Sequence, residues 1–130
     1  MAKSAHNDVL DGLLNIVKNN ATRISVCEGQ PTTYAEATTN KGSGGLKLAI
    51  KTITSANFTG PADGDTSGRK LTKSEDASIT VDVSGNANHV ALSDSANSKL
   101  LVVTTCTQIA IVAANTITIP AWGMKVADPS

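Results

Sequence analysis

The chain has 130 residues, enough for one hydrophobic core and too few for two ordinary domains. Aromatic residues make up only 2% of it, so Val, Ile, Leu and Ala must supply the core, which favours a thin sandwich over a deep pocket. Eleven Lys and Arg balance eleven Asp and Glu, and no basic run could neutralise a row of phosphates, so we expect no nucleic-acid partner. The apolar stretches are far shorter than the roughly 20 residues that span a bilayer, so we expect no membrane partner.

An amphipathic helix is expected over residues 4–19. Ser4 can cap its N-terminus, Asp8 lies near the positive end of the helix dipole, and Lys18 suits the opposite end. Apolar side chains recur between them at helical spacing: Val9, Leu10, Leu13, Leu14, Ile16 and Val17. Gly12 inside this pattern costs about 1 kcal/mol relative to alanine, so we expect it to permit close approach of a neighbouring backbone.

The hydrophobic period changes to two after the helix, which indicates a β-rich region over residues 22–127. The expected strands cover residues 23–27, 46–51, 79–83, 88–93, 100–105, 109–113, 116–120 and 122–126. A short helical turn is expected at residues 32–37, an exposed Gly-rich loop at 40–45, and a dense set of turns at 60–68. We therefore predict a mainly β fold, an antiparallel β-sandwich or flattened barrel with one N-terminal helix, as a single domain over residues 1–130.

The clearest expected hairpin joins residues 79–83 to residues 88–93. Ser84, Gly85 and Asn86 supply a tight reversal between these two alternating runs. Beyond them, the apolar residues change parity after Pro120, as expected when a proline at a sheet edge shifts the register.

The side chains that carry chemistry are few and scattered. His6 and His89 are the only histidines, and no serine lies in a nucleophile-elbow motif, so we expect no catalytic residues and no enzyme. Cys27 and Cys106 lie too far apart in sequence to supply a zinc-ligand pair, and we expect no cofactor. We interpret both cysteines as small buried hydrophobic residues. The alternative is a disulfide, which would stabilise the fold by about 4 kcal/mol in the chain-entropy model, although synthesis in a reducing compartment argues against it.

Asp63 and Asp65, with Ser67 and Gly68, copy the first half of a calcium-binding loop. The second half is missing, because Ser74 occupies the twelfth position, where a bidentate carboxylate is expected. The pattern therefore favours a plain acidic turn over a cation site, and we expect no metal ligands.

Six segments go beyond general patterning. They are MAKSAHNDVLD at residues 1–11, QPTTYAEA at 30–37, ADGDTSGRK at 62–70, NHVAL at 88–92, LVVTT at 101–105 and IPAW at 119–122. Together they resemble a family of small structural proteins of tailed bacteriophages, over nearly the whole chain. The resemblance implies a location in the virion, and capsid decoration, or cement, is the role that we infer from it. The Gly- and Lys-rich residues 40–45 depart from the alternation that is usual there.

A decoration role implies that many copies bind the major capsid protein where its subunits meet, and that trimers or dimers gain avidity on the virion. The expected contact element is the amphipathic helix or the apolar C-terminal run, although we favour a helix that plugs one end of the sandwich. The alternative function is a tail or head-fibre component involved in host attachment. The N-terminal residues lack the features of a signal peptide, so we expect synthesis in the host cytoplasm rather than the secretion of a pilus-like subunit.

Overall fold

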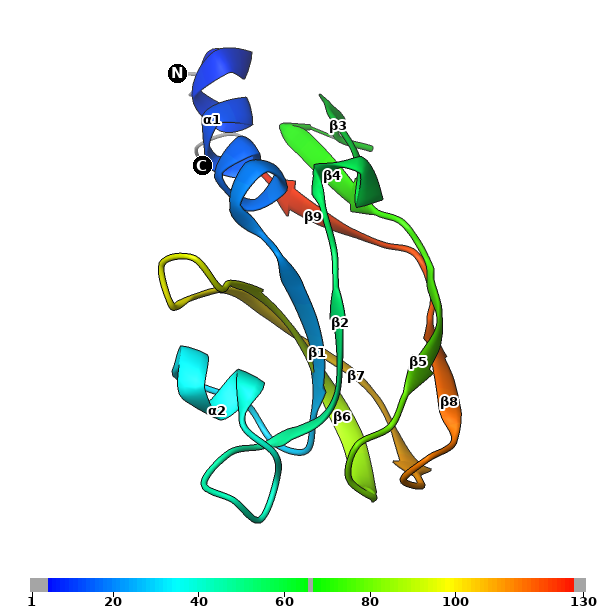
Figure 1. The fold of residues 1–130 in the computed structure, drawn as a ribbon. Coiled ribbons are helices and arrows are strands. Elements are labelled where there is room, and N and C mark those ends of the chain that lie inside the picture. The colour runs from blue at the N-terminus through cyan, green and yellow to red at the C-terminus, as the bar shows by residue number, and fades with distance from the viewer. Residues whose placement is uncertain (1–4, 66, 128–130) are drawn as a thin grey trace.

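Antiparallel sheets dominate the computed structural model, which describes residues 5–65 and 67–127 (Figure 1). The prediction of a mainly β fold with one N-terminal amphipathic helix is confirmed, and the sheets do not close on themselves within the described residues. The elements are α1 (Asn7–Asn20), β1 (Arg23–Cys27), α2 (Tyr34–Thr38), β2 (Lys47–Thr52), the 3-10 helix η1 (Ser55–Asn57), β3 (Phe58–Asp63), β4 (Arg69–Lys73), β5 (Asp76–Thr80), β6 (Gly85–Asp94), β7 (Lys99–Ile111), β8 (Thr116–Ile119) and β9 (Trp122–Val126).

β1 lies inside a four-stranded sheet whose order is β2-β1-β6-β7. It pairs antiparallel with both β2 and β6, and every residue from Ile24 to Cys27 is buried. The alternation of Ile24 and Val26 with polar residues therefore does not give β1 a face toward water. Ser25 is buried too, because other parts of the chain cover both faces of this strand.

A long bent ribbon forms the other side of the molecule. β4 and β5 follow each other in sequence but belong to different sheets, and so do β8 and β9. The segment that contains β4 and β5 stays beside the segment that contains β8 and β9 through the bend, because Lys73 pairs with Trp122 and Asp76 pairs with Ile119 (Figure 1). Just after β5, Val81 bridges to Ala49 of β2. The strands therefore follow one another as β7, β6, β1, β2, β5 and β8, which leaves β7 and β8 at the two ends of the series.

The core between these strands is aliphatic, as the composition predicts. Its central members are Ile24, Val26, Leu48, Leu71, Ile79, Val81, Val90 and Leu92, and Phe58 is the one buried aromatic residue among those described. Leu14 of α1 joins this cluster, so the helix covers one end of the sheets (Figure 1).

α1 begins later than the sequence predicts. Its N-cap is His6, whose Nδ1 accepts a hydrogen bond from the Asp8 amide at 3.1 Å. Ser4, the expected cap, lies outside the described residues. The expectation for Gly12 is wrong, because no heavy atom lies within 4 Å of the position that a Cβ would take there. α1 is also not long and apolar enough to cross a membrane, and the same holds for every other helix in the described ranges.

Only one side of the apolar stripe of α1 faces the core. Leu10 and Leu14 are buried, whereas Val9, Leu13 and Ile16 remain 62%, 53% and 53% exposed. A helix with six apolar residues in nine positions has an apolar face wider than one neighbouring surface can cover. We call the three exposed residues, Val9, Leu13 and Ile16, the α1 stripe.

The expected hairpin between residues 79–83 and 88–93 is wrong. β5 pairs with β8, while β6 pairs with β1 on one side and β7 on the other. The backbone just after β5 hydrogen-bonds to residues other than those of β6. The Val81 amide donates to the Asn115 carbonyl, and the Asp82 amide donates to the Leu48 carbonyl. Gly85 and Asn86, expected in the turn, are the first residues of β6, and the chain bends at Asp82 and Val83 instead. Long-range burial therefore decides both where the chain bends and which strands pair.

Two further expectations differ from the structure near β7 and β3. Residues 100–105 and 109–113 were expected as two strands, yet β7 is one strand of thirteen residues. The register against β6 shifts between Ala87 and His89, so a bulge absorbs the irregular pattern there without ending the strand. β3, where turn formers were expected, pairs with β4 and lies at a sheet edge, which is the position that Pro61 tolerates.

A buried ion pair occupies the bend of the ribbon. Lys73 and Asp76 have side chains that are 0% and 1% exposed, and Lys73 Nζ lies 2.5 Å from Asp76 Oδ2. Nζ also donates to the Ser74 carbonyl at 2.9 Å and lies 5.9 Å from the centroid of the Phe58 ring. Lys51 Nζ lies 3.6 Å from the other Asp76 oxygen. The pair therefore ties the end of β4 to the start of β5.

Replacing Asp76 with Asn leaves the Lys73 ammonium buried without a counter-charge, so we expect the free energy of unfolding to fall by about 3–5 kcal/mol. Urea unfolding of the wild type and of Asp76→Asn measures this loss. The double variant Lys73→Met with Asp76→Leu removes both charges, and we expect it to lie closer to the wild type. A loss in Asp76→Asn no larger than that of an exposed pair, about 1 kcal/mol or less, would contradict the assignment.

Candidate functional site

The two histidines lie in separate parts of the fold. His6 caps α1, and His89 lies on β6, where its Nδ1 is 2.7 Å from Asn88 Oδ1. In residues 5–65 and 67–127, no three His, Cys, Asp or Glu side chains come close enough to hold a metal ion. His6 Nδ1 also lies 3.6 Å from Asp8 Oδ2, but both of these side chains are exposed, and the two histidines do not share a site.

Asp63 and Asp65 face different cations. Asp63 accepts a hydrogen bond from Arg69 at 2.6 Å, and the same guanidinium also binds Asp11 of α1. Asp65 accepts hydrogen bonds from Lys70 and Lys125, both at 2.7 Å. These bonds, first that from Lys125, lower the pKa of Asp65 to about 2. The acidic turn is thus bound to β4 and β9 by its own carboxylates.

The two cysteines have different surroundings. Cys27 is fully buried in β1, and burial raises the pKa of its thiol to about 12. Cys106 is exposed on β7, so its interpretation as a buried residue is wrong. Neither is in a disulfide. The difference arises because both faces of β1 are covered over residues 24–27, whereas both faces of β7 are exposed over residues 105–110.

The free side of β7 is the most unusual surface of the fold. Every residue from Leu100 to Met124 is uncharged, and this run includes all of β7 beyond Lys99. Ile109 is 62% exposed, and Val112 just after the strand is 57% exposed. Edge strands are usually protected by charges or proline against pairing with another chain, and β7 contains neither beyond its first residue. We call the outer side of residues 100–111 the β7 edge.

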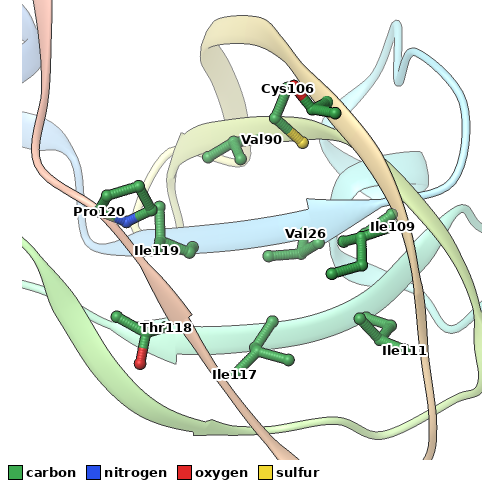
Figure 2. A pocket seen from close by; sticks show the side chains of 11 residues that line it. Val26, Val90, Cys106, Ile109, Ile111, Ile117, Thr118, Ile119 and Pro120 are labelled. Carbon is green, nitrogen blue, oxygen red and sulfur yellow. The ribbon is translucent and has the colours of Figure 1, made fainter.

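An apolar cleft of about 490 Å³ opens between β7 and β8 (Figure 2). Val26 of β1 and Val90 of β6 lie at its floor, and the Cys106 sulfur points toward it from β7. Isoleucines line its walls: Ile109 and Ile111 from β7, Ile117 and Ile119 from β8. Such a lining can receive apolar side chains, but it presents no general acid or base beside the Cys106 thiol.

A second apolar hollow, of about 380 Å³, lies between α1 and β9. Leu13 and Val17 line it from the helix, Trp122 and Met124 from β9, and Val102 from the first half of β7. The two hollows therefore share β7 as a wall, one at each half of the strand.

The sequence analysis names the helix and the apolar C-terminal run as contact elements, but it does not identify the free edge of β7. Its signal was the absence of charge from Leu100 to Met124 in a chain whose acidic and basic residues are otherwise frequent. Depletion of charge is the compositional mark of interface cores. The alternation within an individual strand indicates only which of its residues face the core.

No protein-family model, curated protein or solved structure matches this chain.

Asp65→Asn tests the electrostatic role of the acidic turn. The folded-state pKa of Asp65, about 2, lies below its ordinary value of 3.8, so the charged carboxylate stabilises the fold. This contribution is fully present above the ordinary value and is lost as the pH falls through about 2. Thermal unfolding between about pH 2 and about pH 7 should show the variant melting slightly lower at neutral pH and the two curves converging in acid. A difference that is equal at both extremes would contradict this origin.

Proposed function

We propose that this protein is a non-enzymatic structural subunit of a bacteriophage virion, a capsid decoration protein that binds the major capsid protein. The observation that carries the proposal is the set of exposed apolar side chains on the α1 stripe, together with Ile109 and Val112 at the end of β7. Exposed apolar side chains that gather on one face mark sites of protein–protein contact. The six segments that resemble small tailed-phage structural proteins support a location in the virion.

The α1 stripe is the surface that we assign to the capsid. Val9, Leu13 and Ile16 stand at positions i, i+4 and i+7, the spacing with which an amphipathic helix fills a groove on a partner. Leu10 and Leu14 hold the opposite side of the helix on the core. The helix thus both plugs one end of the sheets and offers a preformed apolar face, so no ordering of the helix is needed on binding.

Affinity per copy would be modest. Each stripe side chain is already about half covered, so its complete burial adds about 1 kcal/mol. Many such contacts at equivalent sites of a lattice act together, and a homo-oligomer that engages several sites gains avidity. This matches the demand on a decoration protein, whose copies jointly resist the internal pressure of packaged DNA.

The copy number in purified virions tests the location. We expect quantitative mass spectrometry to find hundreds of copies on full heads. Particles that lack the protein should lose their DNA at a lower temperature and adsorb to host cells at the normal rate. Intact thermal stability with impaired adsorption would instead indicate a tail or head fibre and reject decoration.

Leu13→Lys tests the assignment of the α1 stripe. Because Leu13 is 53% exposed, we expect the variant to fold with nearly unchanged stability but to be lost from the heads during purification. Asn19→Lys adds the same charge to an exposed position at the end of the same helix and should remain bound. Equal retention of both variants would exclude the stripe as the capsid contact.

A further inference from the structure

We propose that the β7 edge is a self-association surface, at which a second copy of this chain pairs its own β7 in antiparallel orientation across a two-fold axis. The inference rests on the proposed function, since it assigns the contact between copies of an assembly subunit. It uses a surface other than the α1 stripe, so the two assignments can fail separately.

Backbone N–H and C=O groups on the β7 edge are free to hydrogen-bond to another strand. β7 has thirteen residues and, within the described chain, hydrogen-bonds along one side only, to β6. In an antiparallel sheet, alternate residues direct their N–H and C=O groups to opposite sides of the strand. About half of the β7 backbone groups therefore point away from the sheet, and a second β7 offers the same groups in complementary order.

The charge distribution favours the same strand of another copy in antiparallel orientation. No charged residue lies between Leu100 and Met124, so two β7 edges meet without like-charge repulsion. Lys99, at the start of β7, is the exception. Antiparallel pairing sends the two Lys99 side chains to opposite ends of the joined strands, whereas parallel pairing would place them together.

Side chains at the edge also suit a two-fold contact. Ile109 and Val112 are exposed beside the cleft between β7 and β8. With the axis at Cys106, residues 101–105 of the second copy lie against residues 107–111 of the first. Leucine and valine side chains from that segment can then cover the cleft, and the symmetry makes this contact twice.

The area available indicates a reversible dimer. Standard interfaces bury about 35 Å² per contacting residue, so the thirteen residues of β7 and the four of β8 would bury roughly 600 Å² per copy. This is near the lower end of the range for specific complexes. We therefore expect the dimer to form at high local concentration, as on a lattice, and to dissociate on dilution.

Cys106 is a built-in reporter of this arrangement. It lies next to the midpoint of β7 and is exposed, whereas Cys27 is buried and cannot compete. Antiparallel pairing about an axis at Cys106 places the two Cys106 residues directly opposite each other, within the short Cα separation that a disulfide needs. Copper phenanthroline with dissolved oxygen removes two electrons and two protons from the two thiols, and should link two chains.

The experiment combines sedimentation equilibrium with this oxidation, on the purified full chain. We expect a monomer–dimer equilibrium from micromolar to near-millimolar concentration and rapid cross-linking that Cys106→Ser abolishes. The matched control is Cys106→Ser with Ser43→Cys, which places one exposed thiol in the loop at residues 40–45 and should cross-link only at the slow collisional rate. A monomer at every concentration would overturn the proposal.

Charge substitution tests the surface independently. Ile109→Lys should fold, because the side chain is 62% exposed, and should weaken the dimer about tenfold or more, because its ammonium would be buried against an apolar cleft. Val9→Lys has the same starting exposure on the α1 stripe and should leave the dimer unchanged. A dimer that tolerates Ile109→Lys and does not cross-link through Cys106 would place the contact elsewhere.

The same variants tell the two proposals apart. Leu13→Lys should lose head binding and keep the dimer, whereas Ile109→Lys should lose the dimer and keep head binding.

Discussion

The bend held by Lys73 and Asp76 determines where the fold stays open. At this point β4 continues into β5, and the antiparallel segment beside them runs from β8 to β9. One long two-stranded ribbon therefore contributes strands to two sheets. The bend turns β8 toward the far edge of the four-stranded sheet without bringing it into hydrogen-bonding register with β7. The apolar cleft between these two strands is the consequence. Burying an ion pair removes both charges from water, which offsets most of their attraction. We therefore explain the pair by its position at the bend and not by a gain in stability.

The scarcity of aromatic residues shapes the surface as much as the core. With Phe58 as the one fully packed ring among the described residues, the interior is built from aliphatic side chains on closely spaced strands. A thin core of this kind cannot bury every apolar residue of a long amphipathic helix and a thirteen-residue strand. The excess appears on the α1 stripe and the β7 edge, where it can drive association instead of folding.

Two apolar surfaces on different elements would let one subunit make two kinds of contact. A helix face suits a groove on a different protein, whereas an unpaired strand suits a copy of itself. Under the proposed function, the first contact places each copy on the lattice and the second joins neighbouring copies. Each contact is weak alone, and their combination gives the avidity that a decoration protein needs.

The sequence by itself determined the type of most elements, because the apolar period depends only on local geometry. The helix spacing of residues 9–17, the alternation in β1 and β2, and the change of parity after Pro120 all correspond to elements of the structure. The absence of charge between Leu100 and Met124 was also readable there. Only the tertiary structure decided which partner each element meets. The residue types of Ser84 to Asn86 indicate a tight reversal, yet Gly85 and Asn86 lie in β6 and β5 pairs with β8. Pairing follows from which faces can be buried together across distant parts of the chain. For the same reason Leu10 is buried and Leu13 is exposed, and Cys27 lies between two strands while Cys106 lies on a free edge.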